Sequence, residues 1–262
     1  MAPGTNELHR VAVLSDVHGN VTAYEAVLDD IDRRGIRHVL NLGDVIGKGP
    51  RGSECVRLTR EREIPTVRGN WDTFIARDAV QPWEHAQWVR DRLSDDELAW
   101  LAALPNVHEL VLSGQPIRFF HASAVSEFHR VFAPTTEDEH RAFVAQTDFT
   151  GGGPVPTIVG YGDIHGAYLS VDYGITVFNA GSVGNALDGP GAPYVVLEGT
   201  PGAGAGAGAA EGPGHVGISF VRVPYDVEAE VAVAERLGMP GADAYALELR
   251  EQRYRGSAVA AT

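Results

Sequence analysis

The chain has little cysteine, no excess of positive charge and no long apolar run. Cys55 is its only cysteine, so an internal disulfide is excluded, which fits a reducing compartment. Only 21 Lys and Arg stand against 35 Asp and Glu, and the formal charge of −14 argues against a nucleic-acid partner. The N-terminus has no basic stretch followed by an apolar core, and no apolar run is long enough to cross a bilayer. We therefore expect a cytoplasmic protein without a membrane partner.

The first half of the chain predicts alternating strands and helices. Val11 to Leu14 is a short apolar run, and apolar residues then recur at helical spacing from Tyr24 to Ile31. Val39 to Leu42 predicts the next strand, a helix is expected over residues 52–63, and Thr66-Val67 predicts a third strand. The hydrophobic content of 44% is enough for these elements to enclose a core.

A different arrangement is predicted after residue 90. Ser94 with Glu97 and Thr136 with Glu139 match capping boxes, which open helices. Further strands are predicted at 107–112, 117–120, 157–161, 169–171, 175–178 and 194–197, the last three in a mostly antiparallel sheet. We expect two sheets packed face to face with helices outside.

No internal repeat divides the chain, so we expect one domain over residues 1–262. The Gly/Ala-rich segment 201–214 predicts a flexible loop, with an active-site lid as the alternative. Residues 226–255 predict a C-terminal helical tail of two helices.

Side chains that bind metals follow most of the predicted strands, in short Gly-containing segments. They are Asp16, His18, Asp44, Asn70, His121, Asp163 and His165. Segments after the strands of an α/β sheet converge at one edge, so these side chains can build a single two-metal site. In Asp16-Val17-His18 and in Asp163-Ile164-His165 the two ligands are two residues apart, and an extended backbone would point them to one side. A lone Asp or His would more simply be a helix cap or a bystander, and only their conjunction indicates a site.

Carboxylate and imidazole mixtures suit Mn, Fe, Zn or Ni, and two ions that share a carboxylate are usual in phosphate-ester hydrolysis. The segments with this pattern are SDVHGN at 15–20, LGDVIGKGP at 42–50, VRGN at 67–70, HAS at 121–123, GDIH at 162–165 and NAGSVG at 179–184. Through these motifs the chain resembles the calcineurin-like metallophosphoesterases, specifically their small bacterial and archaeal branch. The resemblance implies a four-layer α/β/β/α fold with two mixed sheets and helices outside.

The resemblance also implies roles for the ligands. One divalent ion would be held by Asp16, His18 and His165, the other by Asn70 and His121, with Asp44 bridging them. A metal-bound hydroxide would attack phosphorus in line, with Asp44 and Asn70 as the residues closest to the chemistry. Mn is the preferred ion, with Fe, Ni, Zn or Mg as alternatives.

Two residues depart from the family pattern. Trp71 stands where the family has a His that contacts the phosphate and protonates the leaving group, and an indole cannot transfer a proton at neutral pH. The general acid is therefore unassigned, esters with acidic leaving groups should react best, and Asp72 loses the partner it would have steadied.

Asp163 stands where the family has a His on the second ion, if residues 162–165 form the last motif. A competing register at 160–163 would leave two ligand positions unfilled. In the preferred register, three carboxylates and two divalent ions give the site a net charge of about +1, whereas two carboxylates would give about +2. An oxygen ligand also favours harder ions such as Mn or Mg.

Several other residues have two interpretations. Asn20, Trp71, His129 and Arg130 are predicted substrate contacts, although His129 and Arg130 are more simply surface residues of a loop. Ser182 predicts a tight turn rather than a nucleophile. His85, His108, His140 and His215 are expected at the surface.

We therefore predict a dinuclear metal-dependent phosphoesterase that hydrolyses a small phosphorylated metabolite, either a phosphomonoester or a phosphodiester. One alternative is a degenerate, non-catalytic protein that binds metal or phosphate. Another is a metal enzyme of the same fold with non-hydrolytic chemistry. The sequence indicates neither the substrate nor the oligomeric state.

Overall fold

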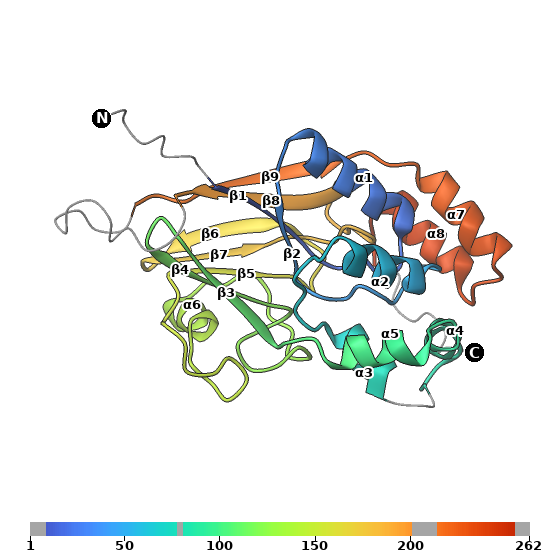
Figure 1. Cartoon of the computed structure of the whole chain (residues 1–262), viewed down its shortest axis with the longest axis horizontal. Coiled ribbons are helices and arrows are strands. Elements are labelled where there is room, and N and C mark those ends of the chain that lie inside the picture. Colours follow the sequence, from blue (N-terminus) through green and yellow to red (C-terminus); the bar gives the residue numbers. More distant parts are fainter. Residues whose placement is uncertain (1–8, 78–80, 201–213, 255–262) are drawn as a thin grey trace.

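The computed structural model describes residues 9–77, 81–200 and 214–254, which form two mixed β-sheets packed face to face (Figure 1). The first sheet has the order β2-β1-β8-β9, in which β1 and β2 are parallel and the other neighbours antiparallel. Its strands are β1 (His9–Leu14), β2 (His38–Asn41), β8 (Ala192–Gly199) and β9 (Gly217–Val223).

The second sheet has the order β3-β4-β5-β7-β6, with β4, β5 and β7 parallel. Its strands are β3 (Val107–Leu112), β4 (Gln115–Phe120), β5 (Ile158–Tyr161), β6 (Tyr168–Asp172) and β7 (Ile175–Asn179). The expectation that residues 169–171, 175–178 and 194–197 share one sheet is wrong, because β8 pairs with β1 and β9 in the first sheet.

Helices cover the outer faces of both sheets (Figure 1). They are α1 (Val21–Arg33), α2 (Gly52–Glu61), α3 (Asn70–Arg77), α4 (Glu84–Arg90), α5 (Asp95–Ala102), α6 (Glu137–Phe143), α7 (Val227–Arg236) and α8 (Ala242–Glu251). The capping boxes at the starts of α5 and α6 are confirmed. The predicted four-layer α/β/β/α architecture is also confirmed.

Each interface between layers has its own apolar core. Leu14, Leu28 and Tyr194 belong to a cluster between the first sheet and its helices, and Val13 and Phe119 to a second cluster between the sheets. A third cluster lies under α6 and includes Phe143 and Tyr161. Alternation along β1, with Val13 on one face and Ala12 and Leu14 on the other, is what lets one strand serve two cores.

Some predicted boundaries differ from the structure. The third strand is reduced to one bridge between Asn41 and Thr66, and the helix expected over 52–63 ends at Glu61.

His140 was expected at the surface but is buried, with its ring nitrogens facing Thr136 O and Ser170 Oγ at 2.8 Å each. The predicted loop 201–214 lies, except for Gly214, outside the described residues. No helix within the described ranges is both long and apolar enough to span a bilayer.

Candidate metal centre

Six of the seven candidate ligands follow the carboxyl ends of strands in both sheets, and Asn70 begins α3. β1 and β2 are parallel, as are β4 and β5, so the segments after each pair leave the sheet at the same edge. Backbone bonds join the first two segments: Asp16 donates its N–H to Gly43 O over 2.9 Å, and His18 donates to Asp44 O over 2.8 Å. These bonds fix the side chains of the two loops relative to each other.

Five of the seven predicted ligands have a left-handed backbone. They are Asp16 (φ 54°), His18 (52°), Asp44 (53°), Asp163 (64°) and His165 (57°). Residues other than glycine seldom adopt this region, and such strained positions concentrate at functional sites. The expectation that Asp16-Val17-His18 and Asp163-Ile164-His165 are extended is therefore wrong, although the two ligands of each segment do face the site.

Asp16, His18 and His165 place three ligand atoms within 4.8 Å of one another, and all three side chains are buried. Asp16 Oδ1 lies 3.5 Å from His18 Nε2 and 3.3 Å from His165 Nε2. The two Nε2 atoms lie 3.0 Å apart. These are the residues that the family resemblance assigns to the first ion.

In each of the three predicted histidine ligands, Nδ1 faces a backbone carbonyl. The pairs are His18 with Ile46 (3.2 Å), His121 with Leu42 (2.8 Å) and His165 with Asn185 (2.7 Å). Because a carbonyl only accepts, Nδ1 of each ring carries a proton, and Nε2 keeps its lone pair whenever the ring is neutral. When His18 and His165 are both neutral, their Nε2 lone pairs face each other at 3.0 Å, which is repulsive unless a proton or a cation intervenes.

The protonation of two of these histidines differs. Burial lowers the pKa of His18 to about 4, so its imidazole is neutral at pH 7. Burial also opposes the charged form of His121, but the carboxylates of Asp44 and Asp16 outweigh it and raise its pKa to about 9. Because a neutral imidazole is the form that binds a metal, an ion at His121 must displace a proton.

Asp44 lies between two histidines that the family resemblance assigns to different ions. Its Oδ2 is 3.6 Å from His18 Nε2 and 3.5 Å from His121 Nε2, and Asp16, Asp44 and His121 form a second group of ligand atoms within 4.8 Å. Asp16 Oδ1 and His121 Nε2 are buried, and within the described chain they have no hydrogen-bond partner. Leaving such an atom unsatisfied costs about 1–3 kcal/mol, and a cation would satisfy both. These oxygen and nitrogen ligand atoms therefore fit bound divalent ions.

Asp163 lies beside His121 and is bonded to Asn70. Asp163 Oδ1 is 3.9 Å from His121 Nε2 and accepts a 2.9 Å bond from Asn70 Nδ2. Ligation by Asn70 would use its carbonyl oxygen, so the amide must turn before it can hold an ion. Tyr161, which the competing register would place here, lies in β5 and donates through its hydroxyl to Val131 O over 3.0 Å. Asp163 is therefore the residue of this segment that faces His121.

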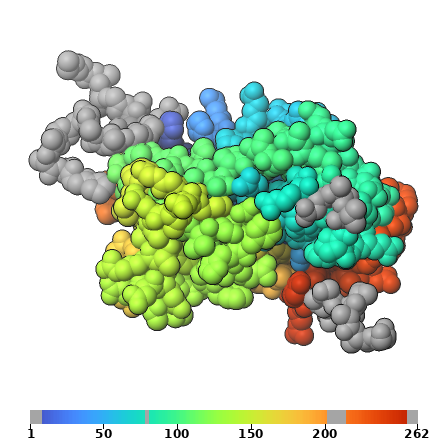
Figure 2. Space-filling view, turned by 90° about the horizontal axis from the view of Figure 1, so that it is seen from below, coloured from blue at the N-terminus to red at the C-terminus, as the bar shows by residue number. Residues whose placement is uncertain are grey.

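Arg130 forms a bidentate ion pair with Asp163. Its Nε and Nη2 lie 2.8 Å from Asp163 Oδ2 and Oδ1 respectively. The Arg130 side chain is 54% exposed, whereas that of Asp163 is 2% exposed. His129 lies exposed on the same loop, which belongs to the green segment after β4 that Figure 2 shows at the surface. The sequence identified Arg130 as a candidate but carried no signal for its pairing with Asp163.

Trp71 is attached directly to the predicted bridging residue, because its backbone N–H donates to Asp44 Oδ1 over 2.9 Å. Its ring meets the His18 ring edge to face, with centroids 6.0 Å apart. On its other sides it packs against the rings of Phe74 and Trp83, whose centroids lie 4.8 and 6.2 Å from its own. An aromatic group thus extends from a candidate ligand to Trp83, which is 50% exposed.

Asp72 has a role that the sequence did not reveal. Its Oδ2 accepts from the backbone N–H groups of Asp44 (2.8 Å) and Gly69 (3.0 Å), and its Oδ1 accepts from Val45 (3.1 Å). Burial raises the pKa of this carboxyl to about 6, which these backbone bonds oppose. Asp72 therefore ties the loop of Asp44 to the segment of Asn70, rather than being left without a partner.

Two other predicted residues have structural partners. Asn20, expected to contact substrate, is fully buried and caps α1: its Oδ1 accepts from Ala23 N and its Nδ2 donates to Gly184 O. That prediction is wrong, since the amide is held inside the fold. Ser182 donates to Asp16 O over 2.8 Å, which confirms a structural turn.

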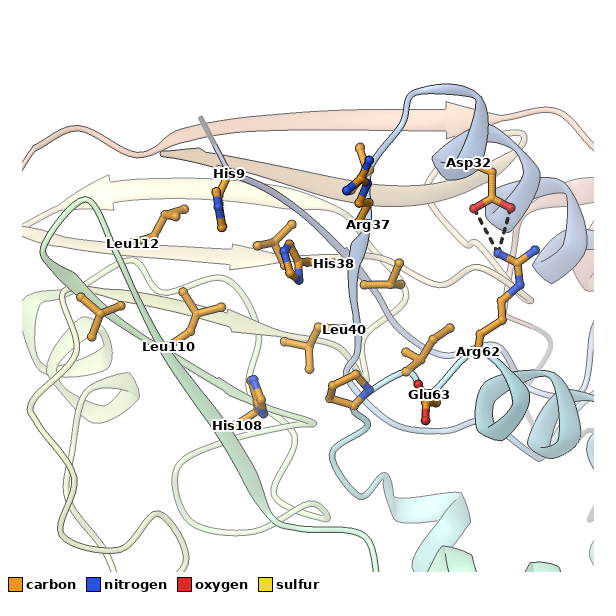
Figure 3. Close-up of a pocket in the computed structure, with 16 residues that line it drawn as sticks. His9, Asp32, Arg37, His38, Leu40, Arg62, Glu63, His108, Leu110 and Leu112 are labelled. Carbon is orange, nitrogen blue, oxygen red and sulfur yellow. Dashed lines mark hydrogen bonds and ion pairs between the residues drawn. The ribbon is translucent and has the colours of Figure 1, made fainter. Parts of the chain in front are cut away.

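A pocket of about 650 Å³ lies elsewhere, between the free edges of β2 and β3 (Figure 3). Its walls include His38, Leu40 and Leu110, and none of the predicted site residues lines it. In the described ranges, both groups of three or more close metal-binding side chains lie at the candidate centre instead. The size of a cavity does not locate the chemistry in this chain.

The sequence and the fold were compared with known proteins. Residues 10–200 match the sequence model of the calcineurin-like phosphoesterase superfamily domain. An uncharacterised protein of Methanocaldococcus jannaschii is 33% identical over 119 residues, which are 43% of this chain and 49% of that protein. The match thus spans about half the length of this curated relative.

Two solved structures share the fold over nearly their whole length. A metallophosphoesterase from Sphaerobacter thermophilus has a TM-score of 0.71 at 23% identity, with 93% of this chain and 99% of that chain covered. A hypothetical protein from Pyrococcus horikoshii OT3 has a TM-score of 0.69 at 17% identity, with 95% and 99% covered. At these identities the likeness establishes the two-sheet architecture and no more.

Proposed function

The chain belongs to the calcineurin-like phosphoesterase superfamily, and on that basis we propose that it is a dinuclear metal-dependent phosphoesterase. Its substrate would be a small phosphorylated metabolite, either a monoester or a diester. The net charge of −14 opposes long-range attraction of phosphate, so attraction must come from cations at the site itself.

The position of Asp44 is the observation that supports two ions most directly. Its Oδ2 is almost equally far from Nε2 of His18 and Nε2 of His121, at 3.6 and 3.5 Å. A carboxylate in that position can share its oxygens between two ions. We propose that Asp44 bridges them, as the family resemblance implies.

We propose Asp16, His18 and His165, which form one group of ligand atoms, for the first ion. For the second ion we propose His121, Asp163, whose Oδ1 lies 3.9 Å from His121 Nε2, and Asn70, which bonds to Asp163. When bound, two divalent ions supply Lewis-acid activation of the phosphoryl group and of the attacking water. Mn is our first choice, with Fe, Ni, Zn or Mg as alternatives, because the ligands mix oxygen and nitrogen.

Around the ions, this chain's own residues would position the substrate. Arg130, His129 and Trp71 are the proposed contacts, Arg130 for the phosphate and Trp71 for the leaving group. Because Trp71 cannot donate a proton to a leaving oxygen, hydrolysis would favour esters whose leaving group needs none. Trp71 is also the observation that favours the alternative of a non-catalytic binding protein.

Metal analysis followed by a phosphate-release assay tests the proposal. Protein purified without chelator should hold close to two ions, and it should hydrolyse nitrophenyl phosphate or its bis-nitrophenyl diester. Chelation should remove the activity, and Mn²⁺ should restore it. Asp148→Asn, a change at an exposed carboxylate in the loop after α6, is the matched control and should behave like the wild type.

The outcomes separate the candidate functions. Two bound ions with no hydrolysis of any ester would favour the non-catalytic alternative. Full activity in metal-free protein would end the proposal altogether.

A further inference from the structure

We infer that the pair of Asp163 and Arg130 together replaces the histidine that the family motif places at residue 163, with Arg130 as a phosphate-binding residue. The inference rests on the proposed function and deepens it. It concerns two residues that are 33 positions apart and that meet at the second ion position.

The bonding of the pair leaves part of Arg130 available. Asp163 takes Nε and Nη2 of the guanidinium, at 2.8 Å each. A guanidinium has five N–H donors in a rigid fork, so Nη1 is left for another acceptor, and within the described chain no acceptor occupies it. With a side chain that is 54% exposed, Arg130 can present this edge to an incoming phosphate.

The pair differs from the other exposed arginine pairs of this protein. Arg141 and Glu137, for example, are 64% and 50% exposed, and such pairs contribute little to stability. The Asp163 side chain is only 2% exposed, and its Oδ1 also accepts from Asn70 and lies 3.9 Å from His121 Nε2. A buried carboxylate inside a candidate metal centre is therefore what holds Arg130 in place.

The charge of the site explains why an arginine accompanies this aspartate. The net charge of two divalent ions with three carboxylates, those of Asp16, Asp44 and Asp163, is about +1, whereas a histidine at residue 163 would make it about +2. The guanidinium of Arg130 adds the missing charge and returns the site to about +2. The replacement of His by Asp is thus compensated, and the site keeps its attraction for phosphate.

If Arg130 compensates the charge in this way, it has opposite effects on the binding of phosphate and on the binding of the second ion. The guanidinium attracts phosphate, but it also repels the second ion and shares the Asp163 carboxylate with it. Removing it should weaken phosphate binding and strengthen binding of the second ion. A purely structural role would weaken both.

Calorimetric titrations of the full-length protein test this prediction without using turnover. Mn²⁺ is titrated into metal-free protein, and inorganic phosphate into the Mn²⁺-loaded protein. Arg130→Met should weaken phosphate about 10- to 100-fold, the range expected for a charged hydrogen bond. The same change should raise the affinity for the second Mn²⁺ ion, seen as the second step of the titration, about tenfold. Arg130→Lys keeps the charge without the fork and should lie between Arg130→Met and the wild type in both titrations.

Two further variants complete the test. Asp163→Asn should weaken the second Mn²⁺ step and also weaken phosphate, because Arg130 loses its anchor. Arg141→Met, at an arginine of similar exposure paired on α6, should change neither titration. Thermal unfolding of every variant checks that the fold is kept.

The inference is overturned if Arg130→Met leaves phosphate binding unchanged, or if it weakens the second Mn²⁺ step. A wild-type protein with a single Mn²⁺ step would instead overturn the dinuclear site of the proposed function. The phosphate titration would still decide the role of Arg130 in that case.

Discussion

The candidate metal centre has two halves that the fold builds in different ways. The first half, formed by Asp16, His18 and His165, is buried, and its two imidazoles are oriented by backbone carbonyls. In the second half only His121 is held in this way, by Leu42 O. Asn70 and Asp163 bond to each other, and Asp163 also bonds to a half-exposed arginine.

The difference shows which half can vary. Side chains oriented by backbone carbonyls depend on the path of the chain, which the sheets fix, whereas Asn70 and Asp163 depend on other side chains. Of the two departures from the family pattern, Asp163 lies beside His121 in the second half, whereas Trp71 contacts the bridge and the first half: its backbone N–H donates to Asp44 Oδ1 and its ring meets the His18 ring. We expect the first ion to be bound tightly and the second to determine which ester is hydrolysed.

The largest expected effect comes from the residue that joins the two halves. Asp44→Asn should lower kcat/KM at least about 100-fold, because even partners outside the ligand shell typically contribute 10- to 100-fold. Calorimetric titration should show a lower affinity for both Mn²⁺ ions, since Asp44 faces a histidine from each group. The control is Asp148→Asn. A variant that loses only one of the two steps would show that Asp44 belongs to one half and does not bridge.

Trp71 tests whether the residue between the bridge and the first half sets the range of esters. Trp71→His should raise hydrolysis of alkyl phosphates relative to nitrophenyl phosphates by up to about 100-fold, the lower end of general acid catalysis. Trp71→Phe, which supplies no proton, is the matched control and should leave the ratio unchanged. Rates across substituted phenyl esters measure the dependence on the leaving group. An equal loss on every ester in Trp71→His would mean that the ring is only structural.

Asp72 tests how the two loops are held together. In Asp72→Asn, one of the two carboxylate oxygens that accept from backbone N–H groups is replaced by an amide nitrogen, which donates and cannot accept. We expect the free energy of unfolding to fall by about 2 kcal/mol, within the range for buried polar groups left unpaired. Urea denaturation of metal-free protein measures the loss, with Asp148→Asn as the control. An unchanged midpoint would show that other contacts hold the loops.

The sequence could single out the candidate ligands because each lies in a short local motif, and six of the seven follow a strand. Asp16 and His18 stand two and four residues after β1, and Asp44 stands three residues after β2. What it could not predict depends on residues far apart in the chain. Arg130 meets Asp163 because the loop after β4 reaches the segment after β5. The pairing of β8 with β1, rather than with β7, likewise joins residues far apart in the chain. Asn20 was assigned to substrate because its motif surrounds a ligand, whereas its amide is used to cap α1.

The smallest expected effect, a change in the choice of ion, concerns Asp163 itself. Asp163→His restores the family's residue in the second half and should keep both ions, while the first half is untouched. Since imidazole is the softer donor, the affinity for Zn²⁺ relative to Mn²⁺ should rise about tenfold. Arg130 loses its carboxylate partner in this variant, so the double change Asp163→His with Arg130→Met should add little to the single change. Competitive metal titration of the second step measures the ratio, and His121→Ala, which removes the second half's own imidazole, shows the signal of a lost step. An unaltered ratio of Zn²⁺ to Mn²⁺ in Asp163→His would mean that residue 163 is not a ligand and serves only to hold Arg130.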